Sequence, residues 1–549
     1  MNFKHISIIQ IVILVLLGLI TTPAFSQKSL TKPEKPNILF IAIDDLKPIL
    51  GCYGNKMIKT PNIDRLATMG TVFMQNYCQQ AVCGPTRASI MTGLRPDNTG
   101  IWDLKTRMRD VNPDILSLPQ YLISQGYSTQ GIGKVYDSRC VDKQMDAPSW
   151  SVPYYNYFKT EAKYYSPETG FPALGQYQLP QTKELVEKYN KEAKDKGITK
   201  GEIDAYVSKL VKPSVECANV PDNAYNDGAN VLRAKEILGK LKMENKPFFF
   251  AVGFSKPHLP FVAPKKYWDM YNRDEMPVAE FQEKSKNGPD IAYHNAGELR
   301  AYSDIPALLE FTDQKVYGLT LPLDKQKELI HGYYAAVSYT DAQVGVLLNT
   351  LDSLGLTENT IIVLWGDHGW HLGDHNLWCK HTNFEQATHA PLIISSPGIK
   401  PSVSSSPSEF VDVFPTLCDL AGVPVPTQLD GKSQVPVMKQ PNKKVKEFSV
   451  SQYPRSGSSG ETERLGYAVG KCMGYSIRTN RYRYTIWMKD NFRSSQIFDQ
   501  KLVVATELYD YQKDPNETVN VADDPQYSVP VADMNEKMLN FLATQVKRK

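Results

Sequence analysis

The sequence predicts an α/β fold built on a large, mainly parallel sheet sandwiched by helices. Three short, largely apolar runs lead to this expectation: residues 36–43, 247–253 and 360–365. Each has the length of one strand and lacks polar alternation, as is typical of strands buried on both faces of a parallel sheet. Helix-like segments separate the runs, and strands that alternate with helices favour a parallel sheet.

The remaining elements follow from the same apolar patterns. In chain order, we expect strands at 36–43, 247–253, 360–365 and 390–394, and helices at 62–69, 116–125 and 334–354. A segment of β character begins near Lys446, with strands at 447–450, 473–487 and 507–511, and a helix over 531–547 closes the chain. We therefore expect a smaller C-terminal α+β subdomain that contains an antiparallel sheet.

A chain of 549 residues is too long to fold around one simple hydrophobic core, so we expect more than one domain. The first 26 residues are typical of a secretory signal peptide, with Lys4, an apolar stretch over 6–20 and small residues at Ala24 and Ser26. The stretch is short for a membrane span, so an uncleaved anchor is the weaker alternative. The expected organisation is a signal peptide at 1–26, a catalytic domain at 27–440 and a C-terminal subdomain at 441–549, in a periplasmic or secreted protein.

The charge balance excludes one class of partner. The chain carries 62 Lys and Arg against 59 Asp and Glu, which gives a formal net charge of +3. A balance this close to neutrality provides no field strong enough to indicate nucleic-acid binding. Any attraction of an anionic substrate must therefore be local.

Polar side chains follow the predicted strands at the point where each strand ends. Asp44 and Asp45 come directly after the first strand, His258 follows the strand at 247–253, and Asp367 and His368 follow the strand at 360–365. Ligands of parallel sheets bind beyond the carboxyl ends of the strands, so these side chains are expected to converge on one edge.

Three carboxylates with few soft ligands indicate a hard divalent cation, most simply calcium, rather than zinc. Adjacent carboxylates such as Asp44 and Asp45 repel one another unless a cation compensates, although an isolated pair can also cap a helix. His371 and His375 are four residues apart, as a zinc pair on a helix would be, but Gly369 and Gly373 favour a loop there. Lys134 and Lys380 are candidate ligands of an anion, since one follows a glycine-rich turn and the other lies among apolar residues.

The run from Val82 to Gly93 has the spacing C-x-P-x-R-x-x-x-x-T-G, beginning at Cys83. It resembles the recognition sequence by which a sulfatase cysteine is oxidised to formylglycine, an aldehyde whose hydrate is the nucleophile. If Cys83 is converted, seven of the eight cysteines remain, so at least one of them must stay unpaired.

Further segments resemble the sulfatase family of the alkaline-phosphatase-like superfamily. They are Ile43–Pro48, Gly51–Gly54, Gln79–Cys83, Lys256–His258, Asp367–Trp370, Thr388–Leu392, Met473–Thr479 and Glu507–Asp510, whereas the stretches near 140–225 and 265–325 have no counterpart. The resemblance implies calcium held by Asp44, Asp45, modified Cys83, Asp367 and His368. It also implies a catalytic sulfate site formed with Cys83 by Arg87, Lys134, His258 and Lys380.

The resemblance also implies the reaction and the partners. One hydroxyl of the residue-83 hydrate would attack sulfur while His258, as a general acid, protonates the departing oxygen. The implied substrate is a sulfated oligo- or polysaccharide, with a 2-O-sulfated uronic acid favoured. The implied partner is a formylglycine-generating or an anaerobic sulfatase-maturating enzyme.

One departure from the family pattern leaves a role open. Sulfatases carry a histidine two or three residues after the equivalent of Lys134, where this chain has Tyr136 and Asp137. Either Asp137 or a histidine from elsewhere would have to take its place. The alternatives to a sulfatase are a phosphate mono- or diester hydrolase of the same superfamily and an inactive protein that binds sulfated glycans.

Overall fold

The computed structural model describes residues 35–156, 160–294, 296–305, 321–455, 472–489 and 500–545. The signal peptide expected at 1–26 lies outside these residues. The predicted boundary between a catalytic domain and a C-terminal subdomain near residue 440 stays a prediction.

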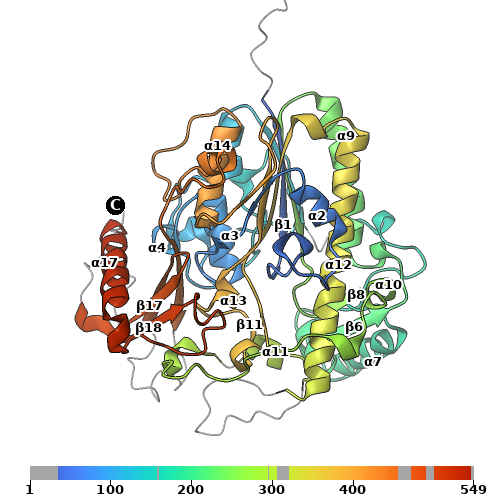
Figure 1. The fold of residues 1–549 in the computed structure, drawn as a ribbon. Coiled ribbons are helices and arrows are strands. Elements are labelled where there is room, and N and C mark those ends of the chain that lie inside the picture. Colours follow the sequence, from blue (N-terminus) through green and yellow to red (C-terminus); the bar gives the residue numbers. More distant parts are fainter. Residues whose placement is uncertain are drawn as a thin grey trace, which may run out of the picture. The chain divides into compact units, whose positions relative to one another are not determined.

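The largest element is an eight-stranded sheet with the order β13-β2-β12-β9-β1-β7-β4-β5 (Figure 1). Its strands are β1 (Asn37–Ile43), β2 (Thr71–Phe73), β4 (Ser128–Gly133), β5 (Tyr155–Asn156), β7 (Phe248–Phe254), β9 (Thr360–Gly366), β12 (Leu392–Ser395) and β13 (Ser402–Ser404). At its centre β1 pairs in parallel with both β7 and β9, and β4 pairs in parallel with β7. The predicted large, mainly parallel sheet is confirmed.

Helices cover both faces of this sheet (Figure 1). One face packs against α2 (Pro61–Ala67), α9 (Asn226–Glu244) and α12 (Leu323–Ser353), and the other against α3 (Cys83–Thr92), α6 (Leu118–Ser124) and α14 (Val413–Leu420). Successive side chains of a strand point to opposite faces, and β1 divides accordingly. Leu39, Ile41 and Ile43 join the first core, whereas Ile38, Phe40 and Ala42 join the second.

A second sheet, antiparallel and four-stranded, is formed by the C-terminal part of the chain. Its strands are β15 (Ser449–Arg455), β16 (Cys472–Arg478), β17 (Tyr482–Lys489) and β18 (Val503–Asp510), in that order. Met534 and Met538 of α17 (Ser528–Thr544) share a core with Tyr484 and Ile486 of β17. The predicted C-terminal α+β unit with an antiparallel sheet is therefore present.

Apart from α7 (Pro180–Asp195), the other elements are short. The strands are β3 (Asn76–Tyr77), β6 (Val215–Ala218), β8 (Phe261–Pro264), β10 (His371–Leu372), β11 (Trp378–Cys379) and β14 (Ser408–Glu409). The helices are α4 (Pro96–Thr99), α5 (Met108–Val111), α7 (Pro180–Asp195), α8 (Ile203–Leu210), α10 (Lys265–Trp268), α11 (Gly297–Arg300), α13 (Glu385–Thr388) and α15 (Val435–Lys439).

The structure differs from the sequence-based expectation in several elements. The segment expected as one strand at 473–487 forms two, β16 and β17, and the helix α9 was not expected. The strand β4 was not predicted, because its sequence, STQGIG, lacks an apolar run. The strand β12 was predicted as a member of a parallel sheet but runs antiparallel to β9 and β2. The helix α12 begins at Leu323 rather than near Tyr334. Pro322, and not a polar capping residue, precedes its first turn, so the usual sequence signal for the start of a helix is missing.

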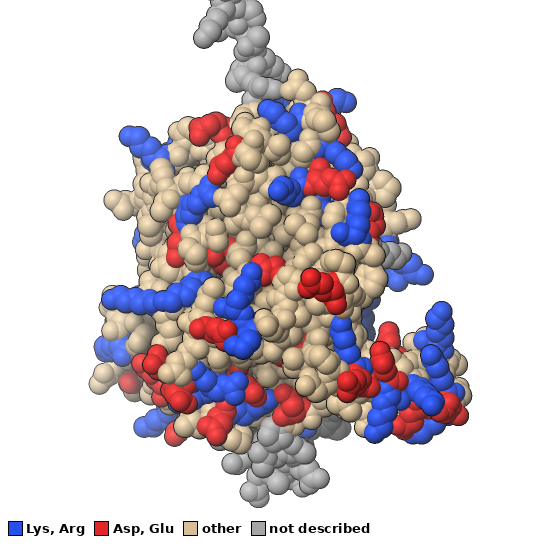
Figure 2. Space-filling model, turned by 90° about the vertical axis from the view of Figure 1, so that its right-hand side faces the viewer, with Lys and Arg blue, Asp and Glu red and all other residues tan. Residues whose placement is uncertain are grey.

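Three further observations concern the cysteines, the surface charges and the character of the helices. No disulfide joins cysteines within the described residues. Lys and Arg side chains are interspersed with Asp and Glu on the face that Figure 2 shows. Across the described part of the chain, no helix combines the length and the apolar character that crossing a bilayer requires.

Candidate active site

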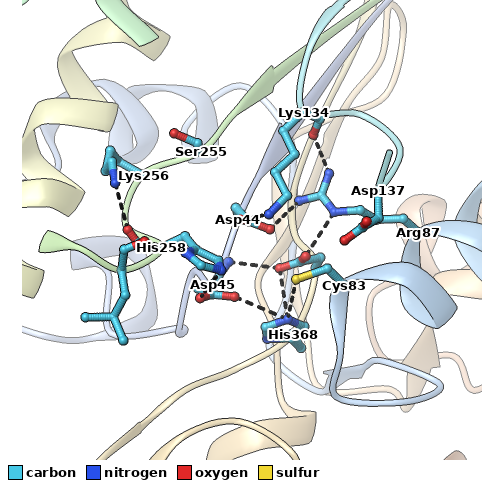
Figure 3. Close-up of polar contacts among 12 residues, drawn as sticks. Asp44, Asp45, Cys83, Arg87, Lys134, Asp137, Ser255, Lys256, His258 and His368 are labelled. Carbon is cyan, nitrogen blue, oxygen red and sulfur yellow. Dashed lines mark hydrogen bonds and ion pairs between the residues drawn. The ribbon is translucent and has the colours of Figure 1, made fainter. Parts of the chain in front are cut away.

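The four central parallel strands deliver polar residues to one edge of the sheet (Figure 3). Asp367 and His368 follow β9, Asp44 and Asp45 follow β1, and Lys134 follows β4. Backbone hydrogen bonds hold these strand ends together: the amide of Asp44 donates to the carbonyl of Phe254, and the amide of Asp367 donates to that of Ile43, both at 3.2 Å. Residues that are hundreds of positions apart in sequence therefore form one site.

The cysteine motif folds as a complete helix, α3. Cys83 is its first residue, Pro85 lies in the first turn where a missing amide hydrogen costs nothing, and Gly93 closes the helix with φ = 67°. Arg87 lies four residues after Cys83, so both side chains are on the same face of α3, towards the strand ends. The four-residue spacing of the motif therefore places Cys83 and Arg87 side by side on the helix face that is turned towards the site.

Arg87 lies beneath the carboxylates and not in an open pocket. Its guanidinium donates to Asp44 Oδ1 at 2.9 Å, to Asp367 Oδ2 at 3.0 Å and to the backbone carbonyls of Lys134 and Val135, and its side chain is fully buried. With these donors occupied, Arg87 fixes two carboxylates and neutralises part of their charge. The sulfate contact expected for Arg87 stays a prediction.

The carboxylates form a compact, fully buried cluster. One ligand atom from each of Asp45, Cys83, Asp367 and His368 lies within 4.8 Å of the others, and Asp44, Asp45, Cys83 and His258 form a second such set. Burial would raise the pKa of Asp44, yet Lys134 and Arg87 hold it well below its usual range. Burial does raise the pKa of Asp45.

His368 presents one nitrogen to this cluster in a defined state. Its Nδ1 lies 2.9 Å from the carbonyl oxygen of Gly369, and since a carbonyl only accepts, Nδ1 carries the proton. The lone pair of Nε2 then faces Cys83 Sγ at 3.6 Å and carboxylate oxygens of Asp45 and Asp367 at 3.3 and 3.5 Å. This is how a metal-ligating histidine is oriented.

Two lysines flank the carboxylates from opposite sides. Lys134 forms an ion pair with Asp44 Oδ2. Lys380, which follows β11, lies 3.0 and 3.1 Å from the two oxygens of Asp45 and 4.8 Å from the ring centroid of Trp370. The lysine side chains are 23% and 3% exposed, so Lys134 is the more open of the two cations.

His258 lies at the open side of the site. Its Nε2 is 3.8 Å from Asp45 Oδ2 and 3.1 Å from Glu298 Oε1, and a quarter of its side chain is exposed. The turn that carries it is fixed by Asp227 of α9, which accepts hydrogen bonds from the amides of Ser255 and Lys256 at 3.0 and 2.9 Å. An exposed imidazole beside buried charges suits proton transfer to a bound molecule.

Cys83 itself is a neutral thiol in this environment. Burial and the charge of Asp44 raise the pKa of its thiol well above the ordinary value, although Lys380 and Lys134 oppose the shift. A thiolate is the reactive form of cysteine, so the unmodified side chain is a poor nucleophile here.

Asp137, at the position of the missing histidine, is held in an ion pair. Its two oxygens accept from Nε and Nη2 of Arg139 at 2.9 and 2.7 Å, and the carboxylate is buried. Although burial would raise its pKa, the hydrogen bond from Arg139 and the charge of Lys134 lower it to about 2. So acidic a carboxyl group is a weak base at neutral pH.

Sequence reasoning missed three residues near the site. Glu298 of α11 contacts His258 and Lys380, but it lies in a stretch without a motif. Tyr453 and Arg455 come from β15 of the C-terminal sheet: the Tyr453 ring lies 6.0 Å from that of His381, and Arg455 donates to the His381 carbonyl at 2.9 Å. Only the three-dimensional structure brings these residues beside Lys380.

The two histidines considered as a zinc pair are not on one helix. His371 belongs to β10 and its Nε2 contacts Thr382 Oγ1 at 2.9 Å. His375 has φ = 55°, stacks on Phe384 and lies 3.4 Å through Nδ1 from Ser285 Oγ. Gly373, with φ = 100°, produces the loop that the sequence indicated.

The chain has the fold of its structural neighbours, with buried carboxylates and a motif cysteine at the edge of a mainly parallel sheet. The sulfatase family model matches residues 36–423, and a model of the C-terminal part of N-sulphoglucosamine sulphohydrolase matches residues 373–544. The chain belongs to the sulfatase family, whose members are sulfuric ester hydrolases.

Individual relatives agree with this assignment. Iduronate 2-sulfatase of Homo sapiens is 34% identical over 540 residues, which cover 89% of this chain and 92% of the relative. Among solved structures, a phosphonate monoester hydrolase of Agrobacterium radiobacter matches with a TM-score of 0.66 at 23% identity, over 93% of this chain and 96% of its own. A protein in complex with its substrate D-glucosamine-2-N,6-O-disulfate matches with a TM-score of 0.64 at 23% identity, over 93% of this chain and 98% of its own.

Proposed function

We propose that this protein hydrolyses the 2-O-sulfate ester of a uronic acid, either free or within a polysaccharide. The observation that carries the proposal is the 34% identity with human iduronate 2-sulfatase over 92% of that relative. The sulfatase family model spans residues 36–423, which include the whole constellation around Cys83. The site supports it, because Lys134 and His258 flank Cys83 and are partly exposed. Cleavage of an anionic ester with a poor leaving group requires a cation and a proton donor of this kind.

The proposed metal is one calcium ion. Asp44, Asp45, Asp367, His368 and residue 83 would hold it. The donor set fits, because carboxylate oxygens dominate and Nε2 of His368 faces them while Nδ1 contacts the Gly369 carbonyl. When bound, such an ion polarises an ester oxygen as a Lewis acid.

The proposed nucleophile is formylglycine made from Cys83. Its hydrate supplies two hydroxyl groups on one carbon, one to attack sulfur and one whose loss of a proton lets sulfate leave as the aldehyde re-forms. A thiol has no such exit, and the Cys83 thiol is protonated as well. Cys83 is 1% exposed, so the maturation enzyme, either formylglycine-generating or anaerobic, would have to act before folding is complete.

The chain's own residues would divide the remaining work. Lys134 and Lys380 would bind sulfate oxygens and stabilise the negative charge that develops there. Arg87 would act one layer below by keeping Asp44 and Asp367 in place. His258 would protonate the departing sugar oxygen through Nε2 as the sulfur–oxygen bond breaks.

A competition between ester classes tests the reaction. Turnover of 4-nitrophenyl sulfate and 4-nitrophenyl phosphate is compared on one preparation, because the phenol leaving group is the same. We expect faster cleavage of the sulfate. Faster cleavage of the phosphate would instead make the protein a phosphate ester hydrolase, and turnover of neither ester would favour a glycan-binding protein.

A panel of defined sulfated disaccharides then tests the substrate. We expect release of sulfate from a disaccharide whose only sulfate is on O2 of the uronic acid, and little release when the only sulfate is on O6 of the amino sugar. The reverse preference would contradict the proposed substrate.

We also propose that the enzyme acts in the periplasm or outside the cell. The support is the signal-like N-terminal sequence, and N-terminal sequencing of protein from its host is the test. A mature N-terminus near Gln27 is expected, whereas an intact N-terminus on all of the protein would contradict the proposal.

A further inference from the structure

We propose that Glu298 is a positioning residue that fixes both His258 and Lys380 in the orientation that sulfate-ester cleavage needs. The inference rests on the proposed function, in which His258 is the general acid and Lys380 binds sulfate. It goes further because it assigns a role to a residue in a stretch without counterpart among the motifs of the family.

One oxygen of Glu298 holds two groups of the site. Glu298 Oε1 lies 3.1 Å from His258 Nε2 and 3.1 Å from Lys380 Nζ. Its second oxygen, Oε2, lies 4.0 Å from His381 Nε2. The carboxylate therefore bridges the strand-end turn after β7 and the loop after β11.

The position of Glu298 is fixed by packing of the backbone that carries it. It belongs to the single turn α11, whose next residue, Leu299, is 1% exposed within the large core under the sheet. The turn packs against β11, directly before Lys380. A carboxylate anchored in this way can orient two mobile side chains at little entropic cost.

The hydrogen bonds of His258 show why a partner at Nε2 matters. Its Nδ1 lies 2.6 Å from the carbonyl oxygen of Leu259, so Nδ1 carries a proton and does not serve the substrate. Nε2 is left as the nitrogen that faces the site. The nearer carboxylate at Nε2 is that of Glu298, at 3.1 Å against 3.8 Å for Asp45.

The charges agree with this arrangement. Burial would raise the pKa of Glu298, but Lys380 and His258 hold it well below its usual range, so it is ionised. As an ionised acceptor 3.1 Å from Nε2, Glu298 can hold the imidazole ring in one orientation. During cleavage the Nε2 proton goes to the sugar oxygen as its bond to sulfur breaks, and Glu298 itself transfers nothing.

The test uses phenyl sulfates whose leaving phenols range from strongly to weakly acidic, so it does not depend on the natural sugar. In Glu298→Gln, whose side chain has the same shape without the charge, we expect turnover of 4-nitrophenyl sulfate to fall less than about threefold. The kcat for the least acidic phenol should fall roughly 10- to 100-fold, and the KM of all members should rise because Lys380 loses one of its two carboxylate partners. An equal loss of kcat across the series, or no loss, would overturn the assignment.

A double-mutant cycle separates positioning from a general structural effect. In a His258→Ala background, Glu298→Gln should reduce kcat for the least acidic phenol by less than about twofold, since the imidazole it positions is gone, whereas the rise in KM through Lys380 should remain. Fully additive losses would overturn the coupling. Glu358→Gln is the matched control: this exposed glutamate lies before β9, at the opposite end of the strand from Asp367, and should behave as wild type.

Different results would contradict the proposed function and the proposed role of Glu298. If wild-type protein carrying the aldehyde at residue 83 cleaves no sulfate ester, the proposed function fails. If wild type is active, Cys83→Ala is inactive and Glu298→Gln shows the wild-type dependence on the leaving group, only the role of Glu298 fails. Thermal unfolding midpoints of the variants within about 3 °C of wild type would show that folding is unaffected.

Discussion

Cys83 and Arg87 lie one turn apart on α3 and divide the tasks of the motif between them. Cys83 faces the site at the start of the helix. Arg87 is buried beneath the site, where it forms ion pairs with Asp44 and Asp367. The sequence predicts that both residues belong to the site. It does not reveal that the arginine is enclosed, because exposure depends on the strands that surround α3.

Replacing Cys83 by alanine should abolish turnover of sulfate esters, with a loss of at least about 10⁴-fold, because the side chain supplies the nucleophile. The change removes one buried sulfur atom, so the unfolding free energy should fall by no more than about 2 kcal/mol. Turnover of 4-nitrophenyl sulfate and chemical denaturation measure the two effects. Activity close to wild type in this variant would defeat the mechanism.

His258→Ala should affect sugar sulfates more than aryl sulfates. A sugar alcohol is a poor leaving group that needs a proton, so we expect a loss of about 10²- to 10⁴-fold for a sulfated disaccharide and a much smaller loss for 4-nitrophenyl sulfate. Steady-state kinetics on both substrates measure the difference. Equal losses would assign His258 to sulfate binding instead.

Asp137→Asn tests whether Asp137 has taken over the role of the absent histidine. Since its pKa is about 2 and Arg139 occupies both of its oxygens, we expect kcat at neutral pH to fall less than about tenfold. A fall of more than about 100-fold, with KM unchanged, would show that Asp137 is the base after all.

At the scale of elements, the apolar strands could be predicted and the polar strand could not. The three central strands β1, β7 and β9 carry continuous apolar runs, which identified both the sheet and the residues at its edge. The strand β4 holds Lys134 in the site although its sequence reads as a turn. Its backbone pairs with β7 over the full length, so tertiary pairing outweighs local propensity there.

Gly133 explains why β4 ends in glycine. It has φ = 79°, and an added Cβ would lie 2.0 Å from the carbonyl oxygen of Gly253 on β7. Gly133→Ala should therefore separate two backbones, reduce the unfolding free energy by more than about 3 kcal/mol and raise the KM for sulfate esters, because Lys134 is displaced. Chemical denaturation and steady-state kinetics measure the two effects.

Gly126→Ala is the control for this change. Gly126 has φ = 89° but no atom within 4 Å of the added Cβ. It should cost only the backbone strain of about 1–2 kcal/mol and leave KM unchanged. Equal effects of the two substitutions would show that the contact with Gly253 is unimportant.

At the scale of the whole molecule, the parts of the site that escaped prediction come from distant segments. Glu298 lies on a single helical turn, and Tyr453 and Arg455 lie on an edge strand of the C-terminal sheet. None of them belongs to a local pattern that indicates a site. Their roles depend on how the two sheets and the connecting loops pack, and single-sequence reasoning does not reach that level.

Glu409 of β14 connects Arg95, which follows α3, with the C-terminal sheet through buried charge. It accepts two hydrogen bonds from Arg95 at 2.6 and 2.8 Å, one from Lys446 at 2.5 Å and one from the amide of Val450 on β15 at 2.9 Å. Burial would raise its pKa, but Arg95 and Lys446 lower it to about 2 from an ordinary value of 4.5.

A carboxyl group whose pKa is lower in the folded state stabilises the protein above its unfolded pKa and loses that contribution as the pH falls. The contribution of Glu409 should therefore be complete above about pH 5 and disappear towards pH 2, with a size on the order of 3 kcal/mol. Glu409→Gln should be less stable at pH 7 and lose less stability on acidification. Denaturant unfolding at several pH values would contradict this if the wild type and the variant showed the same dependence on pH.

The identity of residue 83 in active enzyme tests the central claim most directly. Trypsin should release the peptide Leu66–Arg87, which contains Cys78 as an internal reference thiol. After alkylation, mass spectrometry of active protein from its native host should show one alkylated cysteine and the aldehyde, or its hydrate, at residue 83. Active protein whose peptide carries two alkylated cysteines and no aldehyde would contradict the account.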